Sequence, residues 1–355
     1  MTLVCLFGHR DEPLLIGDTM LSSKEAGTAN IDFPTLRRKR LRASNAKAPY
    51  TVPALTQKIV EITRNLYLGW AGPFYYAVDV INFLIEKCNG ETPSQEKLTA
   101  ISEEINRWKH PDLELVIVCS YGDRWQPFMG NVGILPHPDL GQIIILGSGT
   151  KDFLNHLGRN RFRSVDSDSS MRPANADTIH YALQFMLKAM YQQREFDYGL
   201  DKRWGSALEI LVLRNGLEKV GGILYQTYRY KAGKNGPVIK PFSNKIFAFY
   251  HDADLIVETY SSRDGLLEYV IPPPQKIALG LPSSTNIKRP SSSQLVVTTL
   301  INVDDWGKIQ TFVEWSADGS PHAMLNLSQE GNGTIKFDSD QVIRYYQQIG
   351  KWQNY

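Results

Sequence analysis

The second residue of the chain, Thr2, directly follows Met1 and begins the apolar stretch TLVCLFG. A threonine hydroxyl is a weak nucleophile until a neighbouring base accepts its proton. If Met1 is removed, Thr2 carries both groups, because a free α-amine has an ordinary pKa of about 8 and is partly neutral near neutral pH. Such a site also needs a lysine close by, an aspartate that orients the lysine, and a backbone N–H that binds the oxyanion.

Three further segments contain candidates for these parts: LLIGDT at 14–19, KIVEITRNLYLGWAG at 58–72 and IILGSG at 144–149. With MTLV, they resemble the β-type subunits of proteasomes and the simpler bacterial proteasome-like peptidases, which are N-terminal-nucleophile hydrolases. In that family an aspartate follows the nucleophilic threonine by sixteen residues, as Asp18 follows Thr2. The family's lysine lies fourteen residues before the glycine of the oxyanion hole, as Lys58 precedes Gly72. The match is discontinuous and covers about residues 2–230.

The resemblance implies a role for each matching residue. Thr2 is the nucleophile and its freed amine is the general base, Lys58 supplies positive charge, and Asp18 orients Lys58. The amide of Gly72 stabilises the oxyanion, and two further residues support the amine. The implied catalytic set is Thr2, Asp18, Lys58, Gly72, Ser148 and Asp201. We expect Lys58 Nζ to lie about 3 Å from Thr2 Oγ1.

We assign Ser22, Trp70 and Phe74 to the substrate pocket. Trp70 occupies the position that helps to shape this pocket in the family, and its bulky ring would narrow the pocket. The chain departs from the family in two other places. The interval between Asp18 and Lys58 is longer, with an insertion that holds the basic residues of 37–42. Trp204 stands where the family often has a second serine, and Ser206 is displaced from that position.

Each candidate also has a purely structural interpretation. Thr2 is a β-branched residue suited to the start of a strand, Asp18 is a common turn residue after glycine, and Lys58 is suited to a solvated strand edge. The remaining three are explained as a turn former or helix cap (Ser148), a helix entry (Gly72) and a surface charge (Asp201). The joint spacing favours the catalytic interpretation for Thr2, Asp18 and Lys58.

Hydrophobic periodicity predicts the elements that position these residues. Strands are expected at 2–8, 14–18, 58–62, 66–72, 113–122, 142–149, 207–213 and 221–230, and helices at 74–88, 95–110 and 178–196. Residues 23–54 and 157–176 are predicted to be a long loop and a loop or lid. Further strands are expected at 247–261, 265–273, 294–303 and 308–316, before a last helical pattern near the C-terminus.

This order of elements indicates an α+β protein. The family resemblance implies a four-layer αββα sandwich of the N-terminal-nucleophile hydrolase type. We place this domain at 1–230 and a β-rich C-terminal appendage at 231–355.

Composition excludes several classes of protein. A net charge of +2 over 355 residues gives no global field for nucleic acid or an anionic membrane. No apolar run reaches the length of a membrane span. Cys5, Cys88 and Cys119 lie in apolar stretches, which predicts buried thiols in a reducing, cytoplasmic compartment. The cluster HDAD at 251–254 resembles a metal site, but we interpret it as a solvated loop and expect neither a metal nor a cofactor.

We therefore predict a threonine-type peptidase or amidase that acts on a peptide or protein. The resemblance implies self-assembly into rings and a possible ATPase partner. The alternative is a catalytically inactive, proteasome-like scaffold or binding subunit, which Trp70 and Trp204 favour. A non-proteolytic amidase with the same chemistry is a third possibility.

Overall fold

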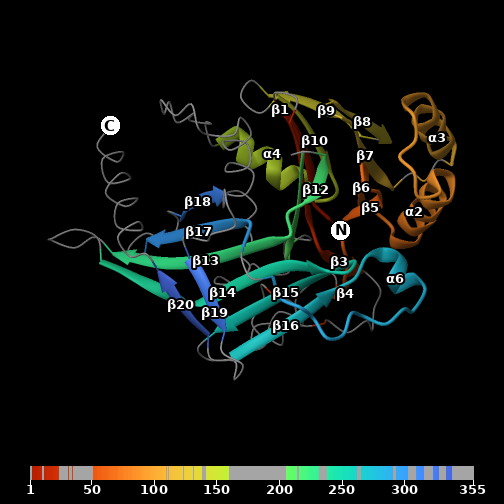
Figure 1. The fold of residues 1–355 in the computed structure, drawn as a ribbon. Helices are drawn as coiled ribbons and strands as arrows, with labels where there is room; N and C mark the ends of the chain where they lie inside the picture. The colour runs from red at the N-terminus through yellow and green to blue at the C-terminus, as the bar shows by residue number, and fades with distance from the viewer. Residues whose placement is uncertain are drawn as a thin grey trace.

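The computed structural model describes residues 2–9, 12–23, 31, 34, 51–108, 110, 112–122, 124–130, 132–137, 141–159, 205–213, 216–231, 238–261, 265–290, 293–302, 309–315, 323–327 and 333–337. Within these ranges the chain is rich in strands and has few helices (Figure 1).

The N-terminal strands lie inside an antiparallel six-stranded sheet, here called the first sheet. Its order is β12 (Leu217–Lys219), β11 (Leu208–Leu213), β2 (Glu12–Asp18), β1 (Val4–His9), β10 (Gly141–Leu146) and β9 (Ile134–His137). Alternate residues of β1 belong to two different cores, with Cys5 and Phe7 on one face and Val4 and Leu6 on the other. A strand covered on both faces reads as a continuous apolar run, which explains LVCLF.

The second sheet is antiparallel and carries two helices. Its order is β5 (Ile59–Thr63), β6 (Leu66–Ala71), β7 (Glu114–Tyr121) and β8 (Arg124–Gly130). α2 (Phe74–Cys88) follows Pro73 and ends at Asn89, whose φ of 49° is left-handed. α3 (Gln95–Arg107) is capped by Ser94, whose side chain accepts a hydrogen bond from Lys97 N at 3.3 Å. Leu84 of α2 and Leu98 of α3 are fully buried against the sheet.

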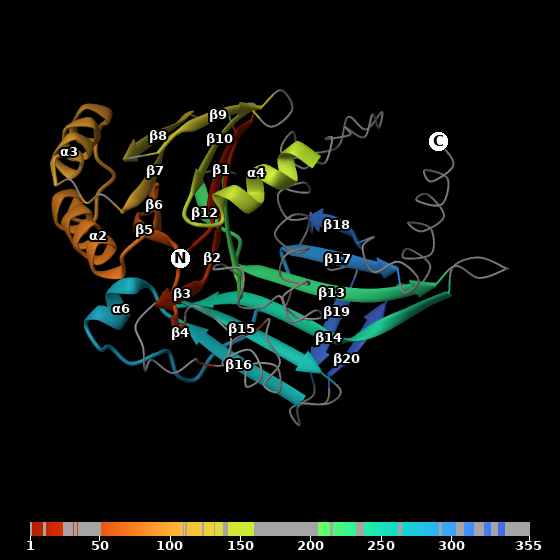
Figure 2. The same cartoon turned by 180° about the vertical axis from the view of Figure 1, so that it is seen from behind.

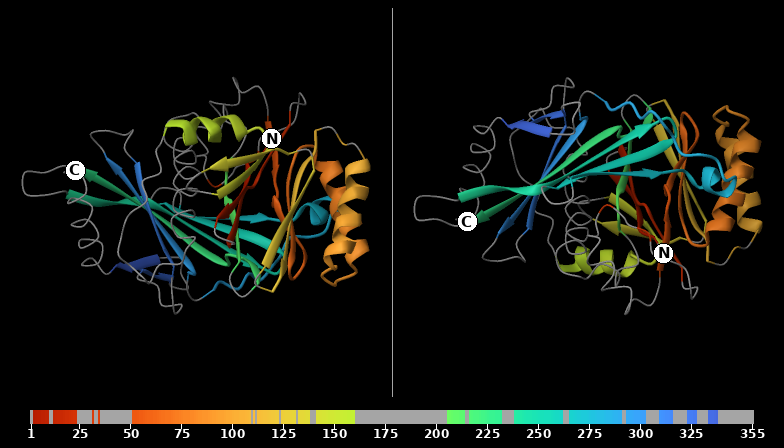
Figure 3. Two further views of the ribbon diagram at one scale, coloured as in Figure 1. Left: turned by 90° about the horizontal axis from the view of Figure 1, so that it is seen from above. Right: turned by 90° about the horizontal axis from the view of Figure 1, so that it is seen from below.

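The two sheets pack face to face. Leu6 and Leu15 of the first sheet meet Val116 and Val118 of the second in one buried cluster. The view from above shows the resulting layers, with α2 and α3 outermost, then the second sheet, then the first sheet (Figure 3). On the far face of the first sheet lies α4 (Thr150–Arg159) (Figure 2). Phe153 of this helix meets Phe7 edge-on, with ring centroids 5.9 Å apart.

A third sheet is formed by C-terminal strands. Its order is β16 (Gly265–Ile271), β15 (Asp254–Ser261), β14 (Val238–His251), β13 (Gly222–Lys231), β17 (Leu295–Asn302) and β18 (Ile309–Trp315). Only β13 and β17 pair in parallel among these described neighbours. Ile223 and Ala248 share a buried core with Cys5 and Ile16 of the first sheet. The third sheet therefore covers part of the first sheet's outer face.

The remaining elements are short. β3 (Met20–Ser23) pairs with β4 (Thr51–Leu55), and β19 (Ala323–Leu327) pairs with β20 (Gly333–Phe337). A short helix, α6 (Pro274–Ala278), follows β16.

Both helices predicted at 74–88 and 95–110 are present, the second ending at Arg107. The loop predicted for 23–54 contains β4. Eight further elements were not predicted: β3, β8, β9, β12, β19, β20, α4 and α6. The strand at 221–230 is hydrogen-bonded within the third sheet rather than the first. The predicted helix at 178–196 and the last helical pattern after 337 lie outside the described residues. The domain bounds 1–230 and 231–355 stay a prediction.

Candidate active site

Strand pairing brings the first two predicted residues side by side. Val4 is opposite Gly17 in the β1–β2 hairpin, so Thr2, just before β1, and Asp18, at the end of β2, lie together at the open end of the hairpin. Lys58 directly precedes β5, and its Cβ lies 3.3 Å from where a Cβ on Gly17 would be. Thr2, Asp18 and Lys58 each have 0% of their surface exposed. The hairpin and the facing strand therefore place all three in the interior.

The Asp18 carboxylate is fixed by two backbone amides. Leu3 N donates to Oδ1 at 3.2 Å, and Gly205 N donates to Oδ2 at 2.8 Å. Burial raises the pKa of Asp18 to about 7, because it disfavours the charged form, while the nearby Lys58 ammonium and these two amides oppose the rise. Asp18 thus connects Leu3, the residue after Thr2, with Gly205, which follows Asp18 by 187 positions.

The Lys58 ammonium is buried and makes no hydrogen bond within the described part of the chain. Its Nζ lies 3.8 Å from the centre of the Trp70 ring, a cation–π contact. Trp70 is held opposite Lys58 by two bonds, from Trp70 N to Lys58 O at 3.1 Å and from Trp70 Nε1 to Gln57 O at 3.1 Å. Burial lowers the pKa of Lys58 to about 8, against the attraction of Asp18 and Glu209.

The Thr2 hydroxyl is likewise buried, and Oγ1 has no hydrogen-bond partner among the described residues. The backbone carbonyl of Thr2 accepts a hydrogen bond from Gly149 N at 3.2 Å. A Cβ on Gly147, whose φ is +90°, would lie 2.1 Å from that carbonyl oxygen, so the turn after β10 requires glycine there. The expected hydrogen bond between Lys58 Nζ and Thr2 Oγ1 is not formed in this structure, because the ammonium is turned onto the Trp70 ring.

Of the other predicted catalytic residues, the structure describes Gly72 and Ser148. Gly72 joins β6 to α2 with a φ of +123°, and a Cβ there would meet Asp112 O at 2.2 Å. Ser148 lies in the turn that contacts Thr2, and its side chain is exposed. Asp201 lies outside the described residues, as does Trp204.

The predicted pocket residues differ in their exposure. Trp70 is fully buried, and Phe74 is half-buried and edge-on to it, with ring centroids 6.4 Å apart. Both belong to the core between α2, α3 and the second sheet. Ser22 is half-buried in β3, next to Leu21, which packs against the same core.

Two residues near this centre were not assigned a role from the sequence. Ser206 has a positive φ of 78°, and its buried hydroxyl has no partner in the described residues. Glu209, opposite Gly17 in the β2–β11 pair, is buried and accepts hydrogen bonds from Lys58 N at 2.5 Å and Ile59 N at 3.0 Å. A buried glutamate in the strand ALEILVL could have been noticed as a lone charge in an apolar run.

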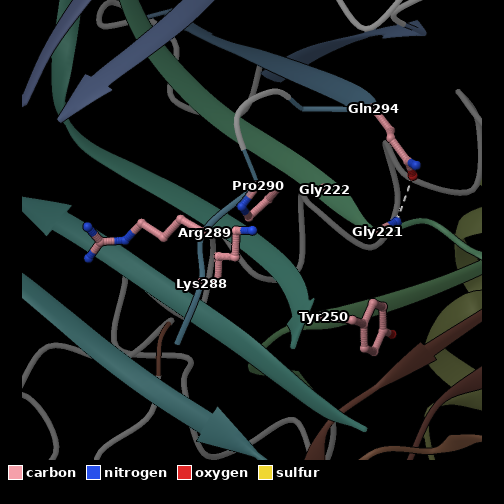
Figure 4. A pocket seen from close by; sticks show the side chains of 7 residues that line it. All are labelled: Gly221, Gly222, Tyr250, Lys288, Arg289, Pro290 and Gln294. Carbon is pink, nitrogen blue, oxygen red and sulfur yellow. Dashed lines mark hydrogen bonds between the residues drawn. The ribbon is translucent and has the colours of Figure 1, made fainter. Parts of the chain in front are cut away.

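A separate pocket of about 470 Å³ opens beside the third sheet (Figure 4). It is lined by Gly221, Gly222, Tyr250, Lys288, Arg289, Pro290 and Gln294. Gly221 N donates to Gln294 Oε1 at 2.7 Å across one wall (Figure 4). Among the described residues that are predicted to be catalytic, none lines this pocket.

No group of three or more metal-ligating side chains occurs in the described ranges. The cluster HDAD is not a solvated loop throughout, since Asp254 is fully buried. Its carboxylate accepts hydrogen bonds from Lys276 Nζ at 3.0 Å and from Ser284 N and Oγ at 2.8 and 2.7 Å. In the part of the chain that is described, no helix has the length and apolar character to cross a membrane.

No protein-family model and no curated protein matches the chain. Among solved structures, the chain is similar to the eukaryotic HslV from Trypanosoma brucei. The similar region covers 60% of this chain and 99% of the HslV chain. The identity is 16% and the TM-score 0.33, so this similarity carries no argument about activity or site.

Proposed function

We propose that the chain is a hydrolase of amide bonds whose nucleophile is Thr2, which becomes the N-terminal residue after removal of Met1. The observation that carries this proposal is the burial of a threonine hydroxyl, an aspartate and a lysine ammonium around the start of β1, with hydroxyl and ammonium both unpartnered among the described residues. Leaving buried polar groups unpaired costs about 1–3 kcal/mol each, and more for a charge. Such a cost is typical of sites that hold groups ready for chemistry.

In the proposed reaction the α-amine of Thr2 takes the hydroxyl proton, and Oγ1 attacks the carbonyl carbon of the substrate. The backbone N–H of Gly72 stabilises the tetrahedral oxyanion. The amine then gives the proton to the leaving nitrogen, the C–N bond breaks, and an ester on Thr2 remains. Water, deprotonated by the same amine, hydrolyses the ester and regenerates the hydroxyl.

Lys58 and Asp18 prepare the nucleophile in this scheme. A cation beside Oγ1 lowers the proton affinity of the hydroxyl, and Asp18 holds the positive charge in the interior. In this scheme the Lys58 ammonium has to leave the Trp70 ring to reach Oγ1. Ser148 and Asp201 are proposed to support the amine.

The proposal extends to architecture and partners. Helices, two facing sheets and α4 succeed one another as in an αββα sandwich, which supports the N-terminal-nucleophile fold (Figure 3). We propose a peptide or protein substrate, assembly into a ring of like subunits, a possible ATPase partner and a cytoplasmic location.

One observation favours an inactive scaffold or binding subunit as the second candidate. Thr2 is completely buried, and the Lys58 ammonium contacts an aromatic ring rather than the hydroxyl. If Met1 stays in place, the amine is blocked and the same residues serve only the fold.

Intact mass spectrometry before and after treatment with a peptide epoxyketone separates the two candidates. A threonine hydrolase should lack Met1 and gain a single adduct, which Thr2→Ala should abolish and Thr2→Ser, which keeps a hydroxyl, should retain. Retention of Met1 with no adduct supports the scaffold. An adduct that persists in Thr2→Ala would show that the nucleophile lies elsewhere.

A further inference from the structure

Both carboxylate oxygens of Glu209 accept two hydrogen bonds each. Oε2 accepts from the backbone N–H groups of Lys58 and Ile59, and Oε1 accepts from Lys219 Nζ at 2.9 Å and from the Tyr250 hydroxyl at 3.2 Å. A carboxylate has about four acceptor positions, and all of them are filled here. Glu209 therefore fixes the backbone of Lys58 from β11, while Lys219 from β12 and Tyr250 from β14 fix Glu209.

The residues just before Lys58 are held by the third sheet and the segment after it. Thr56 Oγ1 and Gln57 N donate to Pro272 O at 3.1 and 3.2 Å. The side-chain amide of Gln57 donates to Ala253 O at 2.6 Å and to Ile271 O at 3.0 Å. Lys219 Nζ closes the network by donating to Gln57 Oε1 at 2.7 Å. Four consecutive residues, 56–59, are thus anchored by groups from outside their own sheet.

The same contacts set the charges around Lys58. Asp18 faces the ammonium from β2 and Glu209 from β11, Trp70 covers it from β6, and Lys219 and Tyr250 face Glu209 from β12 and β14. Two carboxylates and two ammonium groups are therefore buried or nearly buried together: Asp18, Glu209, Lys58 and Lys219. Loss of the charge of one group alters the electrostatic field at the other three.

We propose that Glu209 is a positioning residue for Lys58: it fixes the direction and stabilises the charge of the ammonium, and Tyr250 and Gln57 make the third sheet part of that support. As a statement about catalysis, this rests on the function proposed above. As a statement about Lys58, it stands on the contacts alone.

The direct test is a titration of Lys58 in protein labelled with ¹³C-lysine. The Cε resonance reports the charge of each lysine, and its absence in Lys58→Met identifies the Lys58 signal. Glu209→Gln removes a negative charge that stabilises the ammonium, so the midpoint should fall by about 1 pH unit. Lys219→Met leaves Glu209 without its competing cation, so the midpoint should rise. Tyr250→Phe changes no charge, and its midpoint should lie between those of the two charge variants.

Opposite shifts distinguish positioning from plain loss of structure, because general loosening would let water reach Lys58 and raise its midpoint in both variants. Equal shifts, shifts in the same direction, or no shift would overturn the proposal. Should Glu209→Gln fail to fold, a fall or no change of the midpoint in Lys219→Met still contradicts the proposal, and a rise supports it only where the midpoint of Tyr250→Phe, which changes no charge, rises less.

A second readout connects the proposal to the reaction. The rate of epoxyketone addition to Thr2, measured against pH, should lose its alkaline limb at lower pH in Glu209→Gln and at higher pH in Lys219→Met. If the wild type gains no adduct while the Lys58 midpoints still move in opposite directions, the proposed hydrolase fails and the role of Glu209 stands. If the wild type reacts and the midpoints do not move, the reverse holds.

Discussion

Replacing Lys58 with methionine removes a buried charge but keeps an unbranched side chain of similar length. In the folded protein the pKa of Lys58 is lowered from 10.5 to about 8, chiefly by burial. Between these two values the unfolded chain binds a proton that the folded chain does not. The free energy of unfolding of the wild type therefore rises with pH through this window, and the Lys58→Met variant lacks this rise.

The size of the effect follows from the two pKa values. Each pH unit above the folded pKa is worth about 1.4 kcal/mol, so between about pH 7 and 9.5 the wild type should gain about 2 kcal/mol relative to Lys58→Met. Asp18 adds to this difference. Without the ammonium that opposes the rise of its pKa, Asp18 in the variant stays protonated to higher pH, so the variant loses stability as pH increases.

Urea unfolding followed by tryptophan fluorescence at the two pH values measures this difference. Lys97→Met is the matched control, because Lys97 is exposed on α3 and its loss should give a difference that does not change with pH. A wild-type minus Lys58→Met difference that is flat with pH would refute the reasoning. It would mean that the ammonium is solvated in the folded protein.

Three further predictions concern other parts of the chain. Gly147→Ala should destabilise the protein by about 2–4 kcal/mol in urea unfolding, because the new Cβ would meet Thr2 O at a positive φ, whereas Gly133→Ala, with open space around it, should cost little. Asp254→Asn should cost about 3–5 kcal/mol by breaking the buried pair with Lys276, against little for the exposed Asp252→Asn; similar losses in both would contradict the assignment. Burial raises the thiol pKa of Cys5, Cys88 and Cys119, so a thiol reagent at about pH 8 should modify them only after denaturation, and rapid native labelling would count against their burial.

Periodicity was enough to predict the elements whose signal is local. α2 and α3 have apolar stripes and clear ends, and β1, β2, β6 and β7 are apolar runs buried on both faces. β8 was missed because RWQPFMG contains Pro127 and mixes polar with apolar residues. β3 and β4 pair with each other but are separated by 27 positions of unpatterned sequence, from 24 to 50. They were missed because no local pattern joins them.

The candidate site was only partly predictable for a related reason. Thr2, Asp18 and Lys58 stand at strand ends, and the agreement of their spacing with the family pattern could suggest them. Glu209 could not be connected to Lys58, because their contact spans 151 positions and depends on how two sheets face each other. The turning of the ammonium onto Trp70 depends on side-chain packing, which a sequence pattern does not encode.

The C-terminal strands of the third sheet contribute directly to the surroundings of Lys58. If these strands were an independent attachment, the residues before Lys58 would need no groups from them. Instead Gln57 donates to carbonyl groups after β14 and at the end of β16, and Tyr250 binds the carboxylate that holds Lys58. A buried lysine needs nearby negative charge and a rigid backbone to stay ionised. Here Glu209 of β11 supplies the charge, and the third sheet supplies much of the rigidity. Substitution of Tyr250 should therefore alter the pH at which Lys58 titrates before it alters the fold.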